Sequence, residues 1–328
     1  MNKKILSILI RALVSAVFIL LLLYIMRDKY AQILDAIKNA DIRLVLSGLA
    51  VYILAALIAS YRFKLIVATQ KKTRVTFLEA ISLTFIGYFF NNFLPTSIGG
   101  DVAKAYYLSQ KKSEKLGSFT SVFVDRAIGL FTMIFMAAVA LLFFRSELID
   151  RKVKIAVYLI ALCALGIVIF MTNRNIAKRF AGILSFIKPL EEKAKKAYDA
   201  IHTYKNHTAL IVKALLISVV SQLFFFTSIG ILVFSIGSRI APMEVLLRMP
   251  IISAISLLPS INGLGVREGS TVMLFGPLIG KTNAFAVSIL LLLILFLISI
   301  IGGLIYAFSP QFKVKWGEMK EMKESEAI

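Results

Sequence analysis

The residues of this sequence best suited to chemistry are charged side chains that directly follow helix breaks in apolar sequence. Asp101 and Lys104 come after residues 95–100, where Pro95 and two adjacent Gly residues interrupt the apolar run of residues 77–93. Pro and Gly both disfavour a continuous helix, so this segment predicts a break. At membrane depth a break is tolerated only where protein or a wet cavity satisfies its backbone polar groups, which makes it a candidate substrate site.

A second copy of this pattern lies nearer the C-terminus. Pro259 is followed by Gly263, Gly265 and the charged pair Arg267-Glu268. After each of the two Pro residues, Gly recurs at the fourth position and Val at the seventh. Gly residues leave backbone N–H groups free and Arg supplies a cation, so we expect this break to contact an anion. A chance coincidence of Pro and Gly in two loops is the alternative.

Asp125 and Arg126 are adjacent inside a further apolar stretch. Neighbouring side chains of a helix point about 100° apart, so these two do not satisfy one another and each needs an outside partner. A charge at membrane depth costs about 2.5 to 3.5 kcal/mol on insertion scales. We interpret Arg126 as a ligand of a headgroup phosphate, with a structural salt bridge as the alternative. For Asp101 the alternative is a plain N-cap.

These patterns predict substrate binding rather than catalysis. The sequence contains no metal-ligand spacing, phosphate-binding loop or nucleophile motif, and we expect no cofactor. Asn91 and Asn92 either line the same cavity or form an interhelical hydrogen bond. The candidate substrate-binding residues are Asn91, Asn92, Gly99, Gly100, Asp101, Lys104, Asp125, Arg126, Gly263, Gly265, Arg267 and Glu268.

The elements that position these residues are membrane helices. Hydrophobic residues make up 59% of the 328 residues, and apolar runs of about 20 residues recur. The composition therefore predicts an all-α polytopic membrane protein, with six spans and two re-entrant hairpins built from broken helices. We expect the first span to stay as a helix because it has no signal-peptide cleavage site. The spans are expected at about residues 6–26, 44–68, 118–144, 155–171, 210–236 and 283–308.

The positive charge indicates the orientation. The net charge is +20, and roughly two thirds of the 38 Lys and Arg residues fall in segments that this topology places in the cytoplasm. We therefore predict a cell membrane protein with both termini cytoplasmic: a transmembrane domain over residues 1–312 and a cytoplasmic tail over 313–328. Amphipathic stretches at residues 30–37 and 174–207 should lie on the outer and inner surfaces. The charge pattern suits anionic lipid headgroups as partners, and no nucleic-acid-binding motif occurs.

The order of spans and hairpins predicts an inverted repeat. Repeat one covers about residues 42–144 and repeat two about 209–308, each as span, hairpin, span. Three spans separate the starts of the two units, so the units face opposite ways across the membrane. Inverted repeats with paired broken helices are typical of transporters that bind substrate near mid-bilayer.

These motifs resemble the membrane domain of bacterial lysylphosphatidylglycerol synthase/flippases (MprF-like) over essentially the whole chain. The resemblance implies a domain that moves a lipid between leaflets, in a stand-alone form without the cytosolic aminoacyl-transfer domain. Lys104 stands where the family often has Arg, and residues 96–98 replace a Gly-rich run. These departures affect headgroup specificity, because Lys is a point charge and Arg a bidentate fork. The motifs that carry the resemblance are Pro95-Thr-Ser-Ile-Gly-Gly-Asp101 with Lys104, Asp125-Arg126, and Pro259-x3-Gly263-x-Gly265-x-Arg267-Glu268.

Three functions fit the sequence. We favour a lipid flippase or scramblase for a phospholipid or a polyprenyl-phosphate-linked lipid, because basic amphipathic segments suit headgroups at both interfaces. A membrane transferase acting on a polyprenyl-phosphate carrier and a coupled small-solute transporter are the alternatives. The lipid, the direction, the energy source, the choice between re-entrant and fully spanning hairpins, and the choice between monomer and homodimer stay open.

Overall fold

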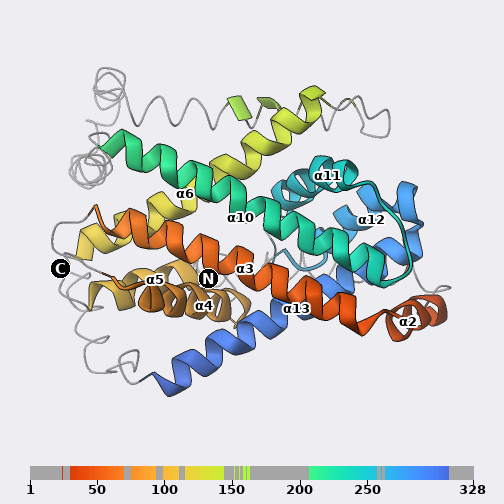
Figure 1. The fold of residues 1–328 in the computed structure, drawn as a ribbon, viewed down its shortest axis with the longest axis horizontal. Helices are drawn as coiled ribbons and strands as arrows, with labels where there is room; N and C mark the ends of the chain where they lie inside the picture. The colour runs from red at the N-terminus through yellow and green to blue at the C-terminus, as the bar shows by residue number, and fades with distance from the viewer. Residues whose placement is uncertain are drawn as a thin grey trace, which may run out of the picture.

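The fold is known here from a computed structural model, which describes residues 24, 30–69, 75–93, 99–110, 115–143, 151, 155, 158, 159, 161, 162, 207–256, 260 and 263–309. In these ranges the regular structure is helical, as the composition predicts (Figure 1). The helices are α2 (Tyr30–Lys38), α3 (Ile42–Val67), α4 (Phe77–Phe93), α5 (Gly99–Ser109), α6 (Lys115–Phe143), α10 (Thr208–Ser235), α11 (Pro242–Ile255), α12 (Val266–Ile279) and α13 (Lys281–Phe308).

Four of the described helices are long and apolar enough to cross a membrane. They are Ile42–Val67, Gly117–Leu142, Ala209–Ser235 and Lys281–Phe308. Each coincides with a span expected from the sequence, which confirms a multi-pass membrane protein. Apart from isolated residues, the expected spans at 6–26 and 155–171 lie outside the described residues, as do the segment 174–206 and the tail 313–328.

Shorter helices flank both expected breaks. α4 ends at Phe93 and α5 begins at Gly99, while α11 ends at Ile255 and α12 begins at Val266. Residues 94–98, 257–259 and 261–262, which include both Pro residues of the motifs, lie outside the described part of the chain. Gly263 and Gly265 adopt positive φ angles of 78° and 79°, which L side chains avoid. These two glycines therefore allow the backbone to turn directly into α12.

The helices that begin the two expected repeats, α3 in the first half of the molecule and α10 in the second, lie side by side and run antiparallel. The Ser228 hydroxyl donates to the Gly48 carbonyl at 2.8 Å, and the Ser221 hydroxyl donates to the Ala55 carbonyl at 2.9 Å. As the residue number rises on α10 it falls on α3, which is the mark of antiparallel neighbours. Small residues such as Gly48 bring the backbones close enough for these bonds.

The remaining helices pack in matched pairs. α4 packs against α13 and α11 against α6, while α5 contacts α6 and α12 contacts α13. In Figure 1 the pair α4 and α5 lies toward the left end of the molecule, and α11 and α12 lie toward the right. Each half therefore sends its two short helices toward the opposite end from the other half.

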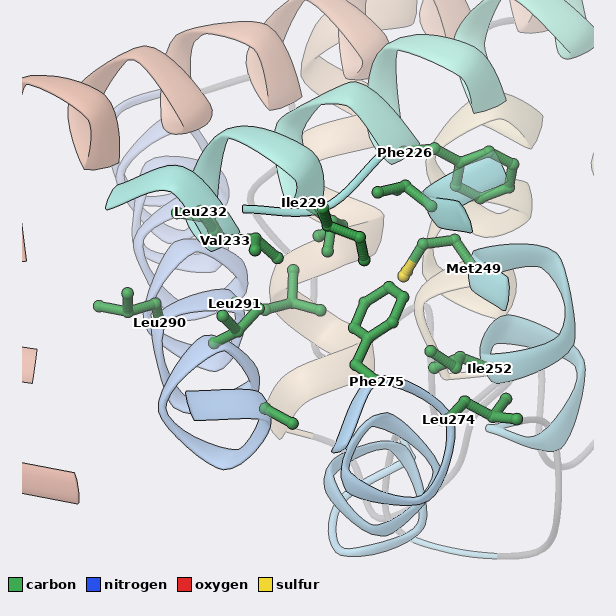
Figure 2. Packing of buried hydrophobic residues seen from close by; sticks show 14 of the residues in the cluster. Phe226, Ile229, Leu232, Val233, Met249, Ile252, Leu274, Phe275, Leu290 and Leu291 are labelled. Carbon is green, nitrogen blue, oxygen red and sulfur yellow. The ribbon is translucent and has the colours of Figure 1, made fainter. Parts of the chain in front are cut away.

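Apolar packing joins the helices of the second half to one another. Figure 2 shows side chains of α10, α11, α12 and α13 meeting around Phe275, which is fully buried with Phe226 and Ile229 close by. α13 also approaches α4 closely: a Cβ added at Gly302 would overlap the carbonyl oxygen of Phe85. On α2, Ile33 and Ile37 join this core while Leu34 stays exposed, as expected of an amphipathic surface helix.

Candidate functional site

A cavity of about 670 Å³ lies between the two halves of the molecule. Residues of α3, α4 and α6 line it from the first half, and residues of α10, α11, α12 and α13 line it from the second. Among the described lining residues the charged ones are all arginines: Arg62, Arg126 and Arg267. No Asp or Glu is part of this described lining, so the cavity presents positive charge. Its neutral polar lining residues are Tyr52, Tyr88, Asn91, Asn92, Ser221, Gln222, Ser253 and Ser256.

Arg62 belongs to a buried cluster that joins four helices. Its Nε donates to Asp125 Oδ1 on α6 at 2.8 Å, and its Nη1 donates to the Ser218 hydroxyl on α10 at 2.7 Å. Lys104 Nζ on α5 contacts the other oxygen of Asp125 at 3.4 Å and lies 3.9 Å from the ring centroid of Phe63. Two cations share one carboxylate, so this cluster keeps a surplus positive charge.

Glycine leaves room for the guanidinium of Arg62. Gly129 lies one turn after Asp125 on α6, and a Cβ there would sit 3.4 Å from Arg62 Nη1. Arg62, Lys104 and Asp125 are each less than a tenth exposed, so they are held out of bulk solvent. A buried ion pair needs such close geometry to offset its desolvation.

Arg126 pairs with Asp101, on the first turn of α5. Arg126 Nη1 lies 3.2 Å from Asp101 Oδ2, and the two side chains are 37% and 20% exposed. The expectation that adjacent Asp125 and Arg126 require separate partners is therefore confirmed. Asp101 and Lys104, three residues apart on α5, reach different partners on α6, Arg126 and Asp125. Because its side chain is the more exposed of the pair and lines the cavity, Arg126 can also contact a ligand.

Arg267 pairs with its own neighbour at the start of α12. Its Nη2 lies 2.8 Å from Glu268 Oε1, and the backbone N–H of Gly265 donates to Glu268 Oε2 at 2.6 Å. The expectation that the Gly265 N–H is free to bind an anion is thus wrong, because the Glu268 carboxylate accepts its hydrogen bond. Gly263 lines the cavity beside Arg267.

The structure divides the expected site residues into two groups. Those that line the cavity are Asn91, Asn92, Arg126, Gly263 and Arg267. Asp101, Lys104, Asp125 and Glu268 do not line it; each holds an ion pair with a neighbouring charge.

The remaining expected residues, Gly99, Gly100 and Gly265, also lie off the cavity surface. The Gly100 N–H donates to Asn91 Oδ1 at 2.9 Å, and a Cβ at Gly100 would overlap the backbone of Gly87. Gly100 therefore serves the close packing of α4 on α5. Asn92 lines the cavity and also donates to the Leu295 carbonyl of α13 at 3.3 Å, so both expectations for the asparagines hold.

The sequence pattern missed Arg62 and most of the neutral polar lining, apart from Asn91 and Asn92. Arg62 lies near the C-terminal end of α3, where a basic residue is ordinarily a surface charge at the membrane interface. Its hydrogen bond to Asp125 spans 63 positions, which no local pattern reveals. Tyr52 and Gln222 lie in apolar spans and Ser253 lies in the apolar helix α11, where a polar side chain is itself a signal of a cavity or a partner.

The site offers cations and neutral hydrogen-bonding groups rather than metal ligands. Within the described ranges no three His, Cys, Asp or Glu side chains gather in a way that would hold a metal ion. Chemically, three guanidiniums around one cavity suit an oxyanion such as a phosphate. Each guanidinium can donate two parallel N–H hydrogen bonds to the phosphate oxygens.

Comparison with known proteins places the chain among membrane proteins of one family. Residues 8–303 match the family described as the lysylphosphatidylglycerol synthase TM region. A UPF0104 membrane protein of Pyrococcus horikoshii is 28% identical over 300 residues, covering 81% of this chain and 87% of the relative. A UPF0104 membrane protein of Methanocaldococcus jannaschii is 25% identical over 291 residues, covering 84% and 85%. The chain thus belongs to the family of the lysylphosphatidylglycerol synthase transmembrane region.

Proposed function

We propose that the protein moves a lipid with a phosphate-containing headgroup between the leaflets of the cell membrane, as a flippase or scramblase. One observation carries the proposal: arginines from both halves of the molecule line a single cavity, while their carboxylate partners stay off its surface. Family membership supports a membrane role connected with lipids.

The paired architecture supports a transport mechanism. Antiparallel α3 and α10, with short helices directed to opposite ends, support an inverted repeat with re-entrant hairpins as part of this proposal. In that arrangement both termini are cytoplasmic, α3 runs from the outer to the inner surface, and α10 runs the other way. Transporters with inverted repeats bind substrate between the repeats near mid-bilayer and alternate access around that site.

The cavity contains a sequence of polar contacts along the proposed path. Tyr52 and Arg62 both line it from α3, and ten residues of helix separate them by about 15 Å. Arg126 follows Asp125, the ion-pair partner of Arg62, whereas Arg267 lies at the start of α12. A phosphate therefore meets Arg62 and Arg126 from the first half of the molecule and Arg267 from the second. Fixed guanidiniums replace the water that the phosphate loses, while the acyl chains stay in lipid.

Lipid movement in liposomes tests the proposal. Purified protein should speed the exchange of fluorescent phospholipids or polyprenyl-phosphate lipids between leaflets, and Arg126→Ala should reduce exchange to the protein-free rate. Arg126→Ala is expected to fold, because an ion pair of this exposure contributes about 1 kcal/mol or less. Arg239→Ala is the matched control, since Arg239 is exposed in the connection between α10 and α11.

The partner of Arg126 provides a second, opposite test. Asp101→Asn removes the carboxylate that competes with a ligand for Arg126, so lipid exchange should persist or rise. Loss of exchange in Asp101→Asn and Arg126→Ala alike, with the fold retained, would instead indicate that the ion pair itself is required. If no lipid moves and a nucleotide-sugar is consumed when polyprenyl phosphate is added, the protein is a transferase.

A further inference from the structure

We infer that the headgroup recognised in the cavity is a phosphate-linked polyol or sugar that carries no amine. This inference rests on the proposed function and names the class of lipid. It is based on the neutral part of the cavity lining, which the arginines do not explain. The lining divides into three kinds of side chain: arginines, uncharged hydrogen-bonding groups, and aromatic or aliphatic groups.

The first step concerns what the cavity lacks in its described lining. An ammonium headgroup buried at membrane depth needs a carboxylate, and no Asp or Glu belongs to that lining. The nearby acids are occupied: Asp125 holds Arg62 and Lys104, Asp101 holds Arg126, and Glu268 holds Arg267. The four cations and three carboxylates of these ion pairs leave a net charge of +1, which would also repel an added cation. An aminated headgroup is therefore disfavoured relative to a neutral polyol on the same phosphate.

The second step concerns hydrogen-bonding groups that lack partners. Tyr52, Tyr88, Gln222 and Ser253 line the cavity, and none of them hydrogen-bonds another side chain or backbone group in the described part of the chain. Together they supply three hydroxyls and one amide, which donate and accept. Hydroxyl-rich ligands match this mixture, since every hydroxyl is also both donor and acceptor. A cavity built for hydroxyls rejects ligands that leave its own polar groups unpaired.

The third step is the order of these groups along the helices. Arg62 on α3 faces Ser218 on α10, and Gln222 follows Ser218 by one turn of α10. Next along α10, Phe225 contacts Tyr52 edge-to-face, with 5.5 Å between the ring centroids. A ligand with its phosphate at Arg62 thus meets an amide next and aromatic rings after it. Aromatic rings offer a flat apolar surface and, in Tyr52, a hydroxyl. The volume of about 670 Å³ lies in the range usual for ligand sites, about 300 to 1,000 Å³.

Two lipid sources share this chemistry: diacyl phospholipids with glycerol or inositol headgroups, and isoprenyl phosphates that carry a hexose. Binding of short-chain forms of both to the purified protein in detergent separates them. The comparison probes are short-chain phosphatidylethanolamine, which adds an amine, and short-chain phosphatidic acid, which lacks the polyol. We expect at least one polyol or sugar probe to bind about tenfold more tightly than phosphatidylethanolamine.

Two substitutions assign the preference to the cavity. Gln222→Leu and Tyr52→Phe should each weaken binding of the preferred polyol probe about fivefold to tenfold, the effect of one lost hydrogen bond, and leave phosphatidic acid binding unchanged. Leu223→Ala is the control, because Leu223 neighbours Gln222 but is exposed away from the cavity. Equal binding of the ethanolamine and polyol probes would overturn the inference, as would polyol binding that is insensitive to both substitutions.

The failure of this inference differs from the failure of the proposed function. Equal movement of ethanolamine and polyol lipids in liposomes would retain lipid transport and reject the polyol headgroup. A polyol preference in detergent that depends on Gln222, without lipid movement in liposomes, would retain the recognition and reject transport. The probe that binds most tightly also decides between the diacyl and isoprenyl sources.

Discussion

Replacing Asp125 by Asn should destabilise the folded protein more than the loss of Asp101 or Glu268, the other carboxylates that pair with a cavity arginine. Asp125 is 7% exposed and balances two cations, Arg62 at 2.8 Å and Lys104 at 3.4 Å. Asn keeps the shape and one acceptor oxygen but removes the charge. Both cations then remain buried without a counter-ion, and breaking a buried pair in this way costs about 3 to 5 kcal/mol.

A second substitution should recover part of that loss. Lys104→Met in the Asp125→Asn background removes one of the two surplus cations and leaves an apolar side chain next to Phe63, over whose ring Lys104 Nζ lies in the wild type. Arg62 retains its bond to Ser218 in either background. We therefore expect the double variant to regain roughly half of the lost free energy of unfolding, about 2 kcal/mol, although Lys104→Met alone is mildly destabilising.

Unfolding titrations in mixed micelles measure these free energies for the wild type, both single variants and the double variant. Asp35→Asn is the control, because Asp35 is exposed on α2, where it accepts a hydrogen bond from Asn39 at 2.9 Å; its loss should cost about 0.5 kcal/mol or less. The reasoning is refuted if Asp125→Asn unfolds within about 1 kcal/mol of the wild type, or if adding Lys104→Met deepens the loss.

Three further predictions concern other parts of the molecule. Single cysteines in a Cys163→Ala background should react only from the cytoplasm at Thr69 and His207 and only from outside at Asn39 and Lys281; labelling of His207 and Lys281 from one side would disprove the inverted orientation. Gly302→Ala should lower the unfolding temperature sharply, because the added Cβ would overlap the Phe85 carbonyl. Gly230→Ala is the control: a Cβ there would lie 3.8 Å from its nearest neighbour, so only a small change from helix propensity is expected. Equal effects of the two substitutions would contradict the close approach of α13 to α4. Arg248→Met should leave the free energy of unfolding unchanged or higher, because Arg248 is 1% exposed and its Nη1 hydrogen-bonds no group in the described part of the chain. Glu244→Ala should cost about 3 kcal/mol by leaving that guanidinium uncompensated, and a collapse of Arg248→Met would show that Arg248 has a needed partner.

The sequence by itself determined the membrane helices and the places where they break. Four described spans agree with their expected positions, because a run of about 20 apolar residues is enough to predict a membrane helix. The start of α12 agrees as well, since Gly263 and Gly265 take a backbone conformation that favours glycine. The need of Asp125 and Arg126 for separate partners followed from helix geometry alone.

The tertiary structure alone decided which charges meet and which face the cavity. Arg62 and Asp125 come from helices far apart in the chain, and their contact exists only because α3 packs beside α6 and α10. The same packing leaves Arg126 and Arg267 on the cavity surface and keeps Asp101 and Glu268 off it. Periodicity states which face of a helix is polar, but not which helix will lie against that face. A local pattern cannot assign partners across helices, because the energy of an ion pair depends on a distance that only packing sets.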